Sequence, residues 1–435
     1  MTSNQISKIK NLRSRFIADG FSSGTSCYVK KAKGAIITDI ENRKYIDFSG
    51  GIAVMNVGHS QPKVISAIKE QAEKFTHTCF MVAPYISAIK LAEKLSLSVP
   101  GKSPKKVVFV NSGVEAVENA IKIARYYSKK PAIIAFENAF HGRTLLGMTL
   151  TSKVKPYKYG FGPYAPEVYR IPFAYCYRCS FNLKYPQCDL YCADYLNEFL
   201  ITNVAPESTA AIIVEPIQGE GGFIVPPDGY FQKLKKICKQ NKLLFIADEI
   251  QTGMGRTGEM FAMKHWNIEA DLTIVAKSLA AGMPLSAVIG IKGIMDSVHK
   301  SGVGGTYGGN PVAVAAALAV FDIFETQNLL EKSKLLEKIL IKSLNSFKTK
   351  YEIVGDIRGI GPMQAMELVS DRVKKSPATK ITKELIEYCY KNGLIILSCG
   401  AYSNVIRFLM PLVTTVNQLK RGLSIIEEGL DKFTE

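Results

Sequence analysis

Short apolar runs alternate with helical stretches through the middle of the chain. The runs that predict buried strands cover residues 107–110, 132–136, 211–214, 243–247, 272–276 and 286–291. Between them, apolar residues recur at helical spacing, for example over residues 116–127 and 228–239. Near-continuous apolar strands separated by helices indicate a mostly parallel sheet covered on both faces, so we predict an α/β fold.

The two ends of the chain follow another pattern. Residues 25–60 contain short strands and turns, with a hairpin expected within 39–51. After a helix pair at about 310–348, residues 351–369 alternate as antiparallel strands do, and a helix at about 379–391, strands at 394–397 and 405–409 and a last helix follow. We expect a large domain over residues 66–325 and a smaller α+β domain built from residues 1–65 and 326–435.

The first residues combine basic side chains with an apolar stripe. Ile6, Ile9, Leu12 and Phe16 recur at helical spacing, which predicts an amphipathic helix docked on the body of the protein or on a partner subunit. A mitochondrial presequence has a similar pattern and stays an alternative. No stretch of about 18 residues is apolar and free of charges and helix breakers, so we expect no membrane span.

Composition and charge narrow the class of protein. Hydrophobic residues make up 47% of the 435 residues and charged residues 21%, which excludes a disordered or collagen-like chain. The formal net charge is +17, but the lysines are scattered and no RNA-binding or zinc-finger pattern occurs, so we expect a basic surface and no nucleic-acid partner. An odd number of cysteines, 9, without a secretory signal favours the reducing cytoplasm.

Three features come at the carboxyl ends of predicted strands, where open α/β sheets bind their ligands. Ser112 and Gly113 open a helix whose N-terminus can bind a phosphate, although a serine there can also be a simple cap. Asp248 ends one strand and would face the cleft, unless it caps a helix or forms a loop salt bridge. Lys277 ends the next strand, and burial there would lower its pKa and favour the nucleophilic amine. The set suits pyridoxal phosphate (PLP).

Longer sequence runs then resemble one family. The runs are NSGVEAVENAIKIAR (111–125), AFHGRT (139–144), VEPIQGEGGF (214–223), IADEIQTGMGRTG (246–258), AKSLAAGMPLSAVIG (276–290) and GTYGGNPVA (305–313). They resemble the class III (omega) aminotransferases, and among these the enzymes that act on 4-aminobutyrate. The resemblance extends from about residue 25 to the C-terminus and implies fold type I of PLP-dependent transferases. It also implies a homodimer, or a tetramer of such dimers, with active sites at the subunit interface.

The resemblance also implies roles for individual residues. Lys277 would be the Schiff-base lysine and proton carrier, and Asp248 would lie at the pyridine nitrogen, with Gln251 at the ring hydroxyl. The other residues expected to bind the cofactor are Ser112, Gly113, Phe140, His141, Glu215, Ile250 and, from the neighbouring subunit, Thr306.

The substrate residues are likewise expected from the resemblance. Arg143 would hold the distal carboxylate of 4-aminobutyrate, and Arg407 the α-carboxylate of glutamate or 2-oxoglutarate. Glu220 would be the switching partner of Arg407, and Ile52 would narrow the pocket. We expect transfer from 4-aminobutyrate to 2-oxoglutarate, giving succinate semialdehyde and glutamate. An ornithine, acetylornithine or lysine aminotransferase, a racemase on the same fold, and a catalytically silent scaffold are the alternatives.

One segment departs from the simplest family pattern. Cys176, Cys179, Cys188 and Cys192 follow a C-x2-C-x8-C-x3-C spacing. Such spacing can hold zinc or an iron–sulfur cluster, so we expect a metal site; two disulfides or free thiols are the alternatives.

Overall fold

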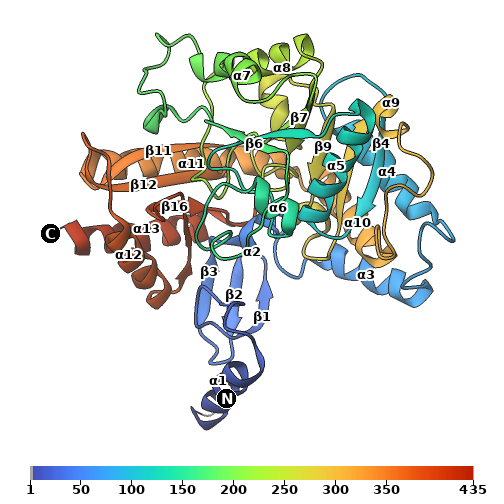
Figure 1. Cartoon of the computed structure of the whole chain (residues 1–435). Coiled ribbons are helices and arrows are strands. Elements are labelled where there is room, and N and C mark those ends of the chain that lie inside the picture. Colours follow the sequence, from blue (N-terminus) through green and yellow to red (C-terminus); the bar gives the residue numbers. More distant parts are fainter. Residues whose placement is uncertain (1–2, 435) are drawn as a thin grey trace.

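A seven-stranded sheet forms the centre of the computed structural model, which describes residues 3–434 (Figure 1). Its strands in spatial order are β4 (Lys105–Val110), β10 (Ser286–Ile291), β9 (Leu272–Val275), β8 (Leu244–Asp248), β7 (Thr209–Val214), β5 (Ala132–Phe136) and β6 (Val168–Ile171). The strands from β9 to β6 pair in parallel, whereas β10 is antiparallel to both of its neighbours. The predicted mostly parallel sheet is therefore confirmed.

Helices cover both faces of this sheet. Alternate residues of β5 point to opposite faces: Ile133 packs in the cluster formed with α5 (Gly113–Ser128), and Ile134 packs with α7 (Tyr191–Thr202) and α8 (Tyr230–Gln240). A third cluster packs α3 (Pro62–Lys74), α4 (Ile86–Ser98) and α10 (Pro311–Thr326) beside β9 and β10. Burial on both faces explains why the strands have no polar alternation.

The two chain ends meet in smaller sheets. The first contains β1 (Val29–Lys33), β2 (Ile36–Asp39), β3 (Lys44–Asp47) and β14 (Leu394–Ile395), and the second contains β11 (Val354–Ile360), β12 (Met363–Asp371), β16 (Val405–Phe408) and β15 (Leu397–Cys399), with β13 (Ser376–Pro377) beside β12. The β2–β3 pair is the predicted hairpin, and β14 joins β3 in parallel. The proposed domain limits at residues 65 and 325 stay a prediction.

The C-terminal helices complete this region. Helices α11 (Leu329–Lys350), α12 (Thr379–Lys391) and α13 (Val416–Thr434) share a buried cluster with β3, β12 and β16. The remaining short elements are α2 (Gly50–Ala53), α6 (Leu145–Leu150), α9 (Lys292–Met295) and the 3-10 helices η1 (Cys176–Arg178), η2 (Ala262–Trp266) and η3 (Lys277–Ala280).

The N-terminal helix forms as predicted, over Ser3–Phe16 (α1), and lies beyond the β1–β3 sheet in Figure 1. Its apolar stripe is covered only in part: Ile6 and Ile9 are half-buried, whereas Leu12 and Phe16 remain 45% and 66% exposed. A partner subunit as the docking surface stays a prediction.

No single described helix has the length and apolar composition of a membrane span. Only α10 and α11 taken together meet those criteria, and they are bent by 69°. Most residues of α10 are buried inside the protein.

Candidate active site

The carboxyl ends of β4, β5, β7, β8 and β9 meet at one edge of the sheet and carry most of the predicted site residues. They surround a cavity of about 330 Å³. The predicted residues that line it are Ser112, Gly113, Phe140, His141, Glu215, Glu220, Asp248, Ile250, Gln251 and Lys277. Residues distant in sequence are thus brought together as expected.

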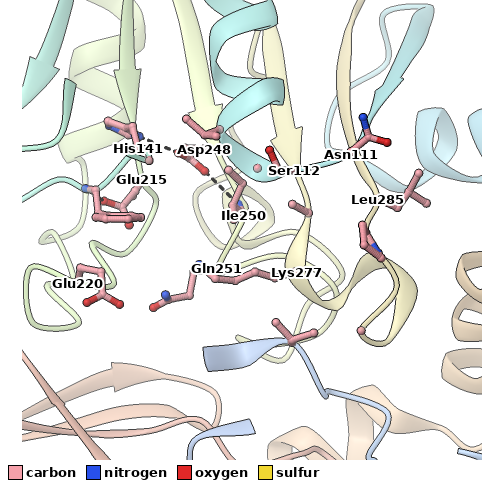
Figure 2. A pocket seen from close by; sticks show the side chains of 18 of the residues that line it. Asn111, Ser112, His141, Glu215, Glu220, Asp248, Ile250, Gln251, Lys277 and Leu285 are labelled. Atoms are coloured by element: carbon pink, nitrogen blue, oxygen red, sulfur yellow. Dashed lines mark hydrogen bonds and ion pairs between the residues drawn. The ribbon is translucent and has the colours of Figure 1, made fainter. Parts of the chain in front are cut away.

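Asp248, the last residue of β8, is held in a fixed orientation. One carboxylate oxygen, Oδ2, lies 2.7 Å from Nδ1 of His141, and the backbone N–H of Ile250 donates to Oδ1 at 3.1 Å (Figure 2). His141 follows β5, and its backbone N–H donates to Thr151 Oγ1 at 3.0 Å. Asp248 and His141 are 3% and 2% exposed, so the carboxylate is nearly removed from water.

Lys277 follows the neighbouring strand β9 and begins the short helix η3. Its φ of 40° is in the left-handed region, which turns the chain sharply where the side chain enters the cavity. The next residue anchors this turn, because Ser278 Oγ donates to Ala53 O at 2.5 Å. Burial lowers the pKa of the Lys277 ammonium, although Glu220, Asp248 and Glu215 act in the opposite direction. The amine is therefore more available than that of a surface lysine.

The N-terminus of α5 opens onto the same cavity. Ser112 Oγ accepts from Glu115 N at 3.4 Å and Glu115 Oε2 accepts from Ser112 N at 3.0 Å, so Ser112 is the helix cap. A cap leaves first-turn N–H groups without partners inside the helix. A Cβ at Gly113 would lie 2.9 Å from Ile250 Cδ1, so any side chain here would push against Ile250. The end of this 16-residue helix can hold a phosphate.

Glu215 joins two loops of the cavity. Its carboxylate accepts from Phe140 N and from Gly219 N, both at 2.9 Å. Burial raises its pKa to about 7, and the nearby Asp248 charge also raises it, while His141 opposes both. Glu215 thereby fixes the loop that presents Phe140 to the cavity.

Two buried polar atoms at the cavity lack a partner among residues 3–434: Gln251 Oε1 and His141 Nε2. Gly219 leaves room for Gln251, because a Cβ on Gly219 would lie 2.1 Å from that oxygen. An unpaired buried acceptor is costly, so this oxygen fits a ligand that carries a donor such as a ring hydroxyl. The residues present therefore fit PLP.

Among the predicted substrate residues, Glu220 lines the cavity, and Arg407 lies directly behind it as its ion-pair partner. Arg407, on β16, is 5% exposed and forms an ion pair with Glu220 through its NH1 and Oε1. Burial alone would raise the pKa of Glu220, but the Arg407 charge outweighs it and holds the pKa below its usual value. Arg143 is exposed, and its guanidinium carbon lies 4.7 Å from the centre of the Tyr157 ring.

Besides Arg143 and Arg407, two further predicted residues, Ile52 and Thr306, do not line the cavity of this chain. Ile52 belongs to the kinked turn α2, has a φ of 63° and is 44% exposed. Thr306 lies in an exposed loop that follows η3 and β10. Both positions leave the predicted roles untested.

The sequence did not single out several residues that contribute to the site. Asn111, Val114, Val54, Met283 and Leu285 line the cavity beside the predicted set. Asn111 and Val114 flank Ser112 and Gly113 in the sequence, so their inclusion could have been inferred from neighbourhood. Tyr157, whose hydroxyl donates to Glu220 Oε2 at 3.3 Å, comes from an irregular loop without any sequence signal.

The expected metal site is not supported by the structure. Within residues 3–434, no group of three or more His, Cys, Asp or Glu side chains could hold a metal ion, and the cysteines are free. Cys176 lies in η1 and is exposed, whereas Cys192 lies in the first turn of α7 against the core. Burial raises the pKa of Cys192 to about 12, and Cys176, Cys188 and Cys179 add to it, so the four thiols lie close enough to interact electrostatically.

A lysine amine of lowered pKa, a fixed carboxylate and an open helix N-terminus around one cavity are what a PLP-dependent enzyme requires. Comparison with known proteins identifies the family: residues 20–430 match the class-III aminotransferase model, and the chain belongs to that family. The structure is accordingly that of a PLP-dependent transaminase of fold type I.

Individual relatives cover nearly the whole chain. A probable 4-aminobutyrate aminotransferase of Bacillus subtilis is 46% identical over 96% of both chains. A 5-aminovalerate aminotransferase of Pseudomonas aeruginosa is 44% identical over 93% of both chains. An amine transaminase from an uncultivated Pseudomonas species, solved with PLP bound, is 28% identical with a TM-score of 0.88, covering 95% of this chain and 97% of that one.

Proposed function

We propose that the protein transfers the amino group of an omega-amino acid, 4-aminobutyrate, to 2-oxoglutarate, giving succinate semialdehyde and glutamate. The relative from Bacillus subtilis supports this donor by its name. The observation that carries the proposal is the buried Arg407–Glu220 ion pair beside Lys277, because it offers a carboxylate site that can be opened or closed.

The cofactor would be held by residues of several strand ends. The helix N-terminus at Ser112 and Gly113 would bind the phosphate, Phe140 and Ile250 would contact the two ring faces, and Gln251 would meet the ring hydroxyl. Bound PLP supplies a carbonyl for the amine and a ring that withdraws electrons from the carbon bearing the nitrogen. Asp248 would hold the proton on the ring nitrogen.

Lys277 would carry the proton during transfer. Its lowered pKa increases the fraction of neutral amine, which can accept the proton from the nitrogen-bearing carbon of the donor. The same Nζ can return a proton when 2-oxoglutarate is aminated. A racemase would need the same lysine but no oxo acid.

The two substrates differ in their carboxylates. 4-Aminobutyrate has one carboxylate, which Arg143 would bind, and it brings nothing to Arg407. Leaving the buried Arg407 unpaired would destabilise the complex with 4-aminobutyrate by several kcal/mol, and Glu220 prevents this by pairing with Arg407. 2-Oxoglutarate brings a second carboxylate, which would replace Glu220 on Arg407. Glu220 would then act as a gate: it covers Arg407 when 4-aminobutyrate binds and moves off Arg407 when a second substrate carboxylate arrives.

We further propose a homodimer. Thr306 is exposed and does not line the cavity of its own chain, which supports a role in the other protomer's site. Ile52 is also exposed, at 44%, and would narrow the pocket from the turn beside Val54. A larger assembly of such dimers would leave both roles unchanged.

A donor screen with 2-oxoglutarate tests the proposal. It compares 4-aminobutyrate, 5-aminovalerate, ornithine, acetylornithine, lysine and β-alanine, and glutamate formation is measured. The highest kcat/KM is expected with 4-aminobutyrate. The relative from Pseudomonas aeruginosa makes 5-aminovalerate the second candidate, and preference for it or for ornithine would overturn the proposed donor. Turnover without any 2-oxo acid would indicate a racemase.

A further inference from the structure

Tyr157 lies where the predicted substrate residues and the cofactor-facing loop come together. Its ring centre is 4.9 Å from that of Phe140, at an interplanar angle of 63°. The guanidinium carbon of Arg143 lies 4.7 Å from the same ring centre, a distance at which a cation–π interaction forms. Its hydroxyl donates to Glu220 Oε2 at 3.3 Å.

The two ends of this side chain therefore serve different partners. The ring supports Arg143 and Phe140, whereas the hydroxyl contacts only Glu220 among the residues of the two carboxylate sites. Burial raises the pKa of Tyr157 to about 12, and the Glu220 charge adds to it. The hydroxyl consequently stays a neutral donor at any pH at which the enzyme would be assayed.

The hydrogen bond belongs to one state of Glu220. In the structure, Oε1 of Glu220 pairs with Arg407 while Oε2 accepts from Tyr157, so both interactions hold the same position of the carboxylate. A substrate carboxylate that replaces Glu220 on Arg407 must displace it from this position. Displacement then breaks the contact with Tyr157 as well as the ion pair.

We propose that Tyr157 is a positioning residue that holds Glu220 on Arg407 and so biases the enzyme toward substrates with a single carboxylate. The inference rests on the proposed function, in which Glu220 is a gate. The hydroxyl stabilises the closed gate, and the ring keeps Arg143 in place for the carboxylate that both substrates share. Loss of the hydroxyl and loss of the ring must therefore have different consequences.

Holoenzyme variants separate the two. Tyr157→Phe keeps the ring and removes the hydroxyl, Tyr157→Leu removes both, and Tyr159→Phe is a matched control at an exposed tyrosine two residues away. Tyr157→Phe should slow the single-turnover half-reaction with 4-aminobutyrate about tenfold and slow that with glutamate less than about twofold. Tyr157→Leu should slow both, and Tyr159→Phe neither.

Binding of a dicarboxylate that cannot react should change in the opposite direction and become tighter in Tyr157→Phe. Glutarate carries two carboxylates and no amine, so it must displace Glu220 to bind both arginines. Its Kd, measured by calorimetry on the holoenzyme, should fall by about tenfold in Tyr157→Phe. In a Glu220→Ala background the Tyr157→Phe change should alter this Kd by less than about twofold, because the hydroxyl acts through Glu220.

The outcomes distinguish this inference from the proposed function. Equal losses in both half-reactions and an unchanged glutarate Kd in Tyr157→Phe would overturn the role of Tyr157 and leave the proposed function standing. A wild-type enzyme that lacks the 4-aminobutyrate half-reaction would overturn the proposed donor. The glutarate titration would then still test the role of Tyr157. A lower Kd in Tyr157→Phe than in the wild type supports this role, and an unchanged Kd overturns it.

Discussion

Asp248 Oδ2 and His141 Nδ1 lie 2.7 Å apart, although 107 residues separate them in the chain. The contact exists because β5 and β8 both end at the same edge of the sheet, with β7 between them. His141 and the N–H of Ile250 occupy different carboxylate oxygens, so Asp248 has little freedom to rotate. A buried carboxylate fixed in this way is prepared to stabilise a proton on the ring nitrogen of PLP.

Replacing Asp248 with asparagine removes that charge and keeps the shape. A carboxylate about 4 Å from a cation at an effective dielectric near 20 is worth roughly 4 kcal/mol, so turnover should fall roughly a hundredfold or more. The melting temperature of the apoprotein should change little by comparison. Steady-state kinetics and thermal melting of Asp248→Asn measure the two effects, and turnover close to wild type would contradict the role of Asp248.

Replacing Glu220 and replacing Arg407 should impair opposite half-reactions. Glu220→Ala leaves Arg407 unpaired when 4-aminobutyrate binds, so the 4-aminobutyrate half-reaction should lose far more rate than the glutamate half-reaction. Arg407→Ala removes the site for the second carboxylate, so the glutamate half-reaction should suffer more. Single-turnover absorbance changes of the cofactor measure each half separately. Equal losses in both halves for Glu220→Ala would refute the gate.

Glu215 predicts a pH dependence of stability. Its pKa is raised from 4.5 to about 7 in the folded protein, chiefly by burial, so the folded state favours the protonated form. The contribution of Glu215 to the free energy of unfolding is fully present below pH 4.5, and it is lost as the pH rises through about 7. Glu215→Gln imitates the protonated form and does not titrate. The stability of this variant relative to wild type should therefore rise between pH 4.5 and 7 in apoprotein melts. A difference that stays constant across this interval would contradict the raised pKa.

The cysteine segment should be independent of metal. Cys176→Ser with Cys179→Ser should leave the melting temperature within about 2 °C of wild type, because no metal-ligand group is lost. A chelator should have no effect on melting. Thiol labelling at pH 8 should modify exposed Cys176 well before Cys192, whose pKa is about 12. About one zinc, or iron with sulfide, per chain in elemental analysis would contradict this prediction.

The sequence predicted the elements whose apolar pattern is continuous. The bounds of β5 and β10 agree with the expected runs 132–136 and 286–291, because both strands are buried on both faces. The strand β6 was missed, since Val168–Ile171 is short and only half-buried, with polar groups on Tyr169 and Arg170. A run of this kind does not differ from loop sequence.

The site was predictable where the backbone determines it. Strand ends bring Asp248 and Lys277 to neighbouring positions in any parallel sheet, so their proximity follows from the order of strands. Tyr157 was not predictable, because a loop position is set by tertiary contacts with Phe140 and Arg143. The spacing of the cysteines in the sequence indicates proximity but not the geometry that a metal requires, so spacing alone does not establish a metal site, and the structure does not support one.

Borohydride reduction followed by peptide mapping tests whether Lys277 bears the cofactor. Reduction fixes a Schiff base as a stable pyridoxyl-lysine. Lys153 is the internal comparison, because burial lowers the pKa of this second lysine near Glu220 as well. We expect absorbance above about 400 nm before reduction and a single labelled residue, Lys277, with the band retained in Lys153→Ala and absent in Lys277→Ala. A label on Lys153 or on another lysine, or an unlabelled protein that still transfers amino groups, would contradict this expectation.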